Sequence, residues 1–189
     1  MTLSLLGLCG SLREGSQNRK LMHEAARRFG PAEFTAGDLR LPLYDGDLEE
    51  REGIPPQVQR LADQVWQADA VLVVTPEYNQ SVSGVMKNAL DWISRVDGSP
   101  WRDKPVALMS AAAGRAGGAR ANYALRLCMA PFRPVIVNGP EVLVAGAAKE
   151  FDAAGRLTSE RYGTALDELM AVLRAEAERR RSEALRRAG

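Results

Sequence analysis

Phosphate-binding side chains gather in one short segment near the start of the chain: Ser11, Arg13, Ser16 and Asn18. An apolar run over residues 3–8 precedes the segment and a helical pattern over residues 21–29 follows it, which predicts a strand, a loop and a helix start. A helix N-terminus presents free N–H groups and a partial positive charge, so it suits an anion. Hydroxyl and amide groups donate hydrogen bonds to phosphate oxygens, and an arginine adds a planar charged fork. The segment therefore predicts a phosphate site.

This loop differs from the two common nucleotide-binding loops. It has neither G-x-x-x-x-G-K-[ST] nor G-x-G-x-x-G, which argues against a nucleoside triphosphate and against the usual dinucleotide loop. A terminal monophosphate fits its hydroxyl-rich composition better. The alternative is a polar strand-to-helix connection in which Ser16 or Asn18 only caps the helix.

The composition is that of an ordinary globular domain. The 189 residues are 46% hydrophobic and 26% charged, with a formal net charge of +1, which predicts a single domain over 1–189 and no nucleic-acid or membrane partner. No basic segment opens the chain, so we expect a cytoplasmic protein. His23 is the only histidine, and Cys9 and Cys128 have no paired spacing, so we expect no histidine triad, no disulfide and no metal site.

Strand and helix patterns alternate along the chain. Strands are predicted at 3–9, 33–39, 70–74 and 105–110, with a broken fifth strand from 134–137 and 141–144. Helices are predicted at 18–29, after Pro55–Pro56, near 85–93 and 119–130, and from about 158 past 173, with a tail after about 174 that we expect to fray. This order predicts an α/β protein, a flavodoxin-like doubly wound three-layer sandwich with a five-stranded parallel sheet.

Three loops then meet at the carboxyl edge of the sheet, where such folds bind ligands: residues 10–18, 76–84 and 111–118. The second loop carries Tyr78 and Asn79 at a strand end. The third is almost without side chains, which lets a flat ring lie against its backbone. A flat, polar-edged heterocycle bearing a monophosphate describes FMN.

Some residues allow two interpretations. Tyr44, in the long acidic loop 41–56, lines a pocket or a subunit contact, or else packs beneath that loop. Trp66 is expected in the core. Arg120 and Tyr123 share a helix face, so they could pair with Glu141 or only decorate the surface.

Three motifs together resemble the NADPH-dependent FMN reductase family, which includes quinone, chromate and azo-dye reductases. They are Gly10-Ser11-Leu12-Arg13-x-x-Ser16-x-Asn18-Arg19, Pro76-Glu77-Tyr78-Asn79-x-Ser81-x-x-Gly84-x-x-Lys87-Asn88-Ala89-Leu90-Asp91-Trp92 and Gly117-Gly118-Ala119-Arg120. The similarity runs from the first strand to the last helix, in the family's order and spacing.

The resemblance implies bound FMN and a ping-pong, two-electron reduction of quinones, flavins, azo compounds or chromate by NADPH or NADH. It implies that the phosphate is bound by Ser11, Arg13, Ser16 and Asn18, with Gln17 also a cofactor-binding residue. Pro76, Glu77, Tyr78 and Asn79 would line the ring and ribityl chain, and Ala111, Ala112 and Gly114 would approach the pyrimidine edge. No catalytic side chain is expected, because the cofactor carries the chemistry; Tyr78 and Asn79 would shape the acceptor site.

The resemblance also implies a homodimer or homotetramer, with loop 41–56 and the helix bearing Lys87, Trp92 and Arg95 as candidate interfaces. Two other functions remain open. A flavodoxin-type electron carrier would share the fold, but such carriers are usually strongly acidic, and the net charge here is +1. A module that binds a phosphorylated ligand without flavin is the third.

Overall fold

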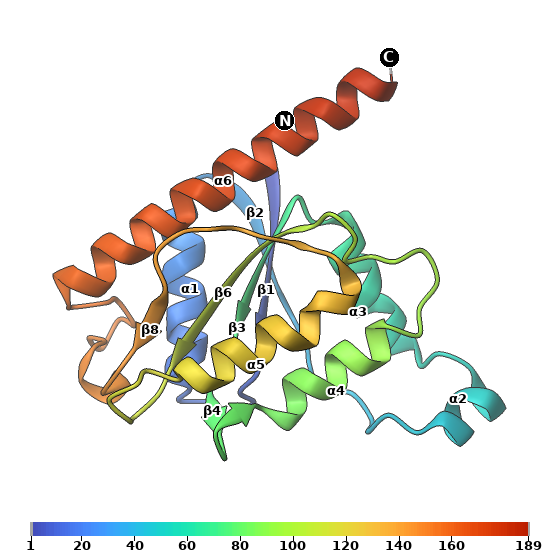
Figure 1. Ribbon diagram of the computed structural model, residues 1–189, viewed down its shortest axis with the longest axis horizontal. Helices are drawn as coiled ribbons and strands as arrows, with labels where there is room; N and C mark the ends of the chain where they lie inside the picture. Colours follow the sequence, from blue (N-terminus) through green and yellow to red (C-terminus); the bar gives the residue numbers. More distant parts are fainter. Residues whose placement is uncertain (1, 189) are drawn as a thin grey trace.

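A computed structural model describes residues 2–188, and its centre is a parallel β-sheet. The strand order is β2-β1-β3-β6-β7, with β8 also paired to β6 (Figure 1). The strands are β1 (Leu3–Cys9), β2 (Ala32–Gly37), β3 (Ala70–Val74), β6 (Pro105–Ala111), β7 (Val135–Ile136) and β8 (Val142–Val144). The predicted doubly wound sheet is confirmed, and β7 and β8 together form the broken fifth strand.

Helices cover both faces of the sheet. On one face α1 (Gln17–Phe29) and α6 (Glu160–Ala188) pack together, and α3 (Pro56–Gln67), α4 (Gly84–Ile93) and α5 (Ala119–Met129) cover the other. Smaller elements complete the chain: α2 (Gly46–Glu52), the hairpin β4 (Glu77–Tyr78) and β5 (Ser81–Val82), and the 3₁₀ turns η1 (Ala130–Phe132) and η2 (Ala147–Lys149). The end of α6 projects beyond the sheet, still helical after residue 174 (Figure 1).

The central strand shows why its sequence is apolar without interruption. All five residues of β3 are buried. Ala70, Leu72 and Val74 face the core formed with α1 and α6, whereas Val71 and Val73 face the core formed with α3, α4 and α5. A strand covered on both faces has no solvent side, so the alternation of polar and apolar residues disappears.

Two expectations about particular segments are wrong. Trp66 is not in the core, since 59% of its surface is exposed. The buried stripe of α3 is formed by Val58, Leu61, Ala62 and Val65, and Trp66 lies just past its edge, facing the glycine turn at Gly98. The acidic loop 41–56 is not all loop, because Asp45 caps the short helix α2.

Neither cysteine forms a disulfide; Cys9 and Cys128 are free and half-buried. Within residues 2–188, no helix is long and apolar enough to cross a membrane. The same part of the chain shows no cluster of three or more potential metal-ligating side chains.

Candidate active site

The carboxyl edge of the sheet brings the three predicted loops together (Figure 1). The loop after β1 begins at Gly10, whose N–H donates to the carbonyl oxygen of Val74 at the end of β3, at 2.8 Å. A Cβ atom added at Gly10 would lie 2.6 Å from Oγ of Ser83, so a side chain there would displace the start of α4. Glycine is therefore needed where the loop after β1 contacts the start of α4.

The first loop ends at the N-terminus of α1, which can bind an anion. Ser16 caps α1, since its Oγ accepts the N–H of Arg19 at 3.2 Å. Gln17 and Asn18 occupy the first two positions of the helix, where N–H groups lack a helical carbonyl partner. The alternative interpretation placed a cap at Ser16 or Asn18, and Ser16 is the capping residue; its hydroxyl hydrogen remains able to donate. Ser11 is also nearly buried, and Arg13 is exposed beside them.

The side chain of Asn18 does not point freely into this loop. Its Nδ2 donates to the carbonyl oxygen of Ala111 at 2.8 Å, and its Oδ1 accepts the N–H of Ala111 at 2.9 Å. The group expected to bind phosphate through its amide instead ties the start of α1 to the end of β6. The backbone N–H of Asn18 is what this position can offer an anion.

The third loop is shaped by glycines and by backbone pairing. The N–H of Ala112 donates to the carbonyl oxygen of Val144, and its carbonyl oxygen accepts the N–H of Ala147. The N–H and carbonyl of Ala111 are both paired with the side chain of Asn18. The N–H groups of Ala111 and Ala112 are thus already paired, so in this loop the N–H groups left for a ligand belong to residues 113–116, which include Gly114. Gly117 has φ +60°, and a Cβ there would lie 2.3 Å from the carbonyl oxygen of Leu143, so only glycine fits.

The second loop is a tight β-hairpin, which the sequence did not predict. Tyr78 pairs with Ser81, and the two residues between them have positive φ, +50° at Asn79 and +64° at Gln80. Both values match the two-residue type I′ turn that fits the twist of a hairpin. Tyr78 is 55% exposed at this edge.

Glu77 anchors the hairpin to α5. Its Oε2 accepts the N–H groups of Arg120 at 3.1 Å and Ala121 at 3.4 Å, and its Oε1 lies 3.8 Å from the guanidinium of Arg120. A carboxylate at a helix N-terminus accepts hydrogen bonds from N–H groups that have no helical partner, and it is attracted by the positive end of the helix dipole. The Glu77 side chain is therefore a cap supplied from another element. Sequence inspection missed it because the two partners are 43 residues apart.

Arg120 and Tyr123 were each open to pairing with Glu141 or to a surface position, and within residues 2–188 Tyr123 makes that pair. The Tyr123 hydroxyl donates to Oε2 of Glu141 at 3.3 Å, whereas Arg120 is engaged by Glu77.

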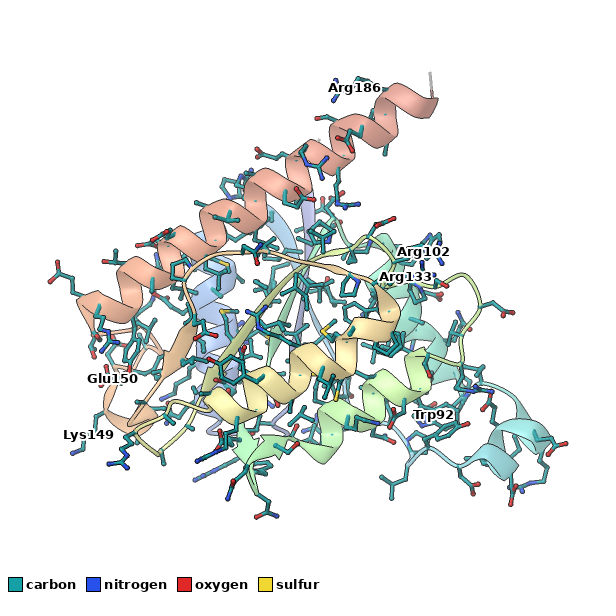
Figure 2. The ribbon with its side chains drawn as sticks, viewed as in Figure 1. Trp92, Arg102, Arg133, Lys149, Glu150 and Arg186 are labelled. Atoms are coloured by element: carbon teal, nitrogen blue, oxygen red, sulfur yellow. The ribbon has the colours of Figure 1, made fainter. Side chains whose placement is uncertain are left out.

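Part of the long second motif fastens loop 41–56 to α4. Nε1 of Trp92 and Nδ2 of Asn88 both donate to the carbonyl oxygen of Pro42, at 2.8 and 2.9 Å. The ring of Tyr44 stands edge-on to that of Trp92 at 5.0 Å, and Figure 2 shows Trp92 between α4 and the segment leading to α2. Tyr44 thus packs against α4, while its hydroxyl donates to Oε2 of Glu49 in its own loop at 3.0 Å.

The groups at this edge offer hydrogen-bond donors and positive charge rather than an activated nucleophile. Burial raises the pKa of the Cys9 thiol, which keeps it protonated. Gln17 has a buried side-chain Oε1 with no hydrogen-bond partner within residues 2–188. Such an acceptor is satisfied by a ligand that brings hydroxyl donors, and a ribityl chain is one. The residues present therefore fit a flavin mononucleotide.

Comparison with known proteins agrees with this chemistry. The family model described as NADPH-dependent FMN reductase matches residues 3–149. An NAD(P)H-dependent FMN reductase of Pseudomonas aeruginosa is 42% identical over 161 residues, covering 84% of this chain and 86% of the relative. A quinone reductase of Escherichia coli (strain K12) is 41% identical over 145 residues, covering 75% and 77%. The solved structure of FerB, a flavoenzyme NAD(P)H:(acceptor) oxidoreductase from Paracoccus denitrificans, superposes with a TM-score of 0.84 at 32% identity, covering 94% of this chain and 98% of that one.

Proposed function

Because the chain belongs to the NADPH-dependent FMN reductase family, we propose that it reduces quinones with electrons from NAD(P)H, using bound FMN. The observation that carries this proposal is the helix start at Ser16–Asn18, where hydroxyl and N–H donors lie together and an exposed arginine, Arg13, stands three residues earlier in the same loop. When bound, FMN supplies the redox chemistry, accepting a hydride from the nicotinamide and passing two electrons to the acceptor.

The residues of the first loop hold the phosphate. The hydroxyls of Ser11 and Ser16 and the N–H groups of Gln17 and Asn18 donate to its oxygens, and Arg13 balances its charge. The amide of Gln17 lies beside the ribityl chain.

The other two loops orient the ring. Pro76 and Glu77 face it through their backbone, since the Glu77 carboxylate is occupied at α5. Tyr78 and Asn79 border the space that the nicotinamide and then the quinone occupy in turn. The loop containing Gly114 would supply N–H groups to the pyrimidine edge, because N–H donors there favour negative charge on the ring. No side-chain acid or base is required.

A quinone is the acceptor favoured by the relatives' names; free flavin, azo compounds and chromate are further candidates of the same chemistry. We also propose that the protein works as a homodimer or homotetramer. Leu127 and Tyr123 on α5 and Leu43 in the loop tied to α4 are large apolar side chains left exposed on neighbouring elements.

The decisive experiment combines an absorbance spectrum with an anaerobic titration. Purified protein should show flavin bands, or acquire them with added FMN, and one equivalent of NADPH should bleach them in a two-electron step. Added benzoquinone should restore the bands and support steady NADPH oxidation. Flavin that NADPH cannot reduce would instead indicate an electron carrier, and a protein that takes up no FMN would refute the proposal.

A further inference from the structure

A cavity borders the loop after β1 on the side away from the loops 76–84 and 111–118. It has a volume of about 270 Å³ and lies between the loop after β1, the first turns of α1 and the end of β2. Its lining includes Ser11, Arg19, His23, Asp38, Leu39 and Arg40. Complete ligand sites usually occupy ~300–1,000 Å³, so this cavity suits one part of a larger ligand. Ser11 lines this cavity and also belongs to the predicted phosphate site, so the cavity lies next to that site.

The charges around the cavity favour a second phosphate and a sugar. Arg19 has no carboxylate partner within residues 2–188. In the same part of the chain, the guanidinium of Arg40 has one carboxylate partner, Asp38, at 3.4 Å; both side chains are exposed, so the contact is weak. Oδ1 of Asp38 accepts the N–H of Arg40 at 3.0 Å, which leaves Oδ2 for a sugar hydroxyl.

The interior of the cavity suits a flat ring. Leu39 is buried and contributes an apolar wall. Partial burial, together with the nearby Arg19 guanidinium, lowers the pKa of His23, so this wall carries a neutral imidazole at neutral pH. Guanidinium planes such as that of Arg40 also stack on aromatic rings.

The topology fixes which part of a ligand can reach the cavity. β1 lies between β2 and β3, so the cavity at the end of β2 and the flavin loops after β3 and β6 flank the phosphate loop on opposite sides. In doubly wound folds that bind dinucleotides, the phosphates lie at the helix start after the first strand, and an acidic residue after the second strand binds the adenosine ribose. Asp38 directly follows β2, at that position.

We propose that this cavity binds the adenosine monophosphate half of a flavin dinucleotide, so that the site accepts FAD as well as FMN. The inference rests on the proposed function, because it requires the flavin phosphate on residues 11–18. The second phosphate lies against Arg19, the ribose hydroxyls donate to Asp38, and the adenine lies between Leu39 and Arg40. The loop needs no dinucleotide glycine fingerprint, since Arg19 and not the loop backbone meets the second phosphate.

The test compares the binding of FMN and FAD to protein stripped of flavin, followed by quenching of flavin fluorescence. We expect the two dissociation constants to agree within about threefold. Arg40→Ala should weaken FAD about tenfold, the size of one guanidinium stacking contact on an aromatic ring, and leave FMN unchanged. Asp38→Asn should also weaken FAD selectively while keeping the local turn, because asparagine retains the acceptor. Arg60→Ala, at an exposed position of α3 away from the cavity, is the matched control.

Each contrary outcome is distinguishable. FMN binding with FAD about 100-fold weaker would overturn the inference and leave the proposed function intact. An equal loss of both flavins in Arg40→Ala would also overturn it. If Arg40→Ala raised KM for NADPH but not for NADH, with the ratio of FAD to FMN affinity unchanged, the cavity would serve the electron donor instead. Failure to bind either flavin would refute the proposed function as well.

Discussion

The side chain of Asn18 and the backbone of Ala111 form a two-way hydrogen-bonded pair, 2.8 and 2.9 Å long, across 93 residues of sequence. Both atoms of the amide are used, and both backbone groups of Ala111 are satisfied. The pair joins the phosphate loop to the strand that begins the ring-binding loop. Two parts of the flavin site are thus held in one geometry before any ligand arrives.

Removing this pair should cost both stability and flavin affinity. Asn18→Ala leaves a buried N–H and a buried carbonyl without partners, so we expect the free energy of unfolding to fall by about 3 kcal/mol. Urea denaturation of the flavin-free protein measures this loss. FMN should also bind more weakly, because the loop is no longer fixed. Gln59→Ala on the exposed face of α3 is the control, and an Asn18→Ala variant as stable as that control would contradict the proposed role.

Arg13 is the free charge of the phosphate site, since it is exposed and no ion pair holds it within the described chain. Arg13→Ala should weaken FMN binding by about 10- to 100-fold, the effect of losing one charge-assisted hydrogen bond to phosphate. Riboflavin, which lacks the phosphate, should bind the variant and the wild type equally. The difference between the two ligands isolates the phosphate contact. A similar loss for riboflavin would show that Arg13 acts on the loop as a whole.

Glu77 should contribute to stability through α5. Glu77→Gln keeps an acceptor but removes the charge at the helix N-terminus, so we expect a loss of about 1 kcal/mol, and a larger loss for Glu77→Ala. Thermal and urea unfolding at low and high salt measure it. Salt should reduce the difference between wild type and Glu77→Gln, because screening weakens the interaction with the dipole. A salt-independent difference would argue against the electrostatic part of the cap.

The sequence predicts the parts of this site that depend on local pattern. The apolar run at Ala70–Val74 predicts a strand that is buried on both faces of the sheet. The small residues before α1 and α5 predict loops at the same edge of the sheet. The Asn18–Ala111 pair could not be predicted, since it depends on how α1 is set against β6, and neither position shows this locally. The prediction that Trp66 lies in the core is wrong for a related reason, because helical spacing cannot locate the edge of a buried stripe to within one residue. The cap from Glu77 has no local signal either.

The hairpin turn stores strain that a single substitution should release. Gln80 adopts φ +64°, which favours glycine, whereas Asn79 tolerates its own positive φ. Gln80→Gly should therefore stabilise the protein by about 1 kcal/mol, since Asn-Gly is the preferred pair for this turn. Gln80→Ala is the control, because it removes the same side chain without relieving the backbone. Equal effects of the two substitutions in urea denaturation would show that the side chain, and not the backbone, matters.

Lys104 should make stability depend on pH above neutrality. Its Nζ donates to the carbonyl oxygens of Trp66 and Ala68, and burial lowers its pKa to about 8. The unfolded chain holds this proton up to the ordinary lysine pKa of about 10.4, so between these two values it binds more protons than the folded protein does. Stability contributed by this group must therefore rise with pH across that window, by about 3 kcal/mol, because the folded state no longer keeps a buried charge.

The measurement is the free energy of unfolding of wild type and Lys104→Met at pH values of about 7.5, 9 and 10.5, a range that spans this titration. Subtracting the variant removes the contributions of all other titrating groups, so the difference should increase steadily with pH. Lys149→Met, at an exposed position, is the control variant. A flat difference for Lys104→Met would mean that the ammonium is as well solvated in the folded protein as in the unfolded chain.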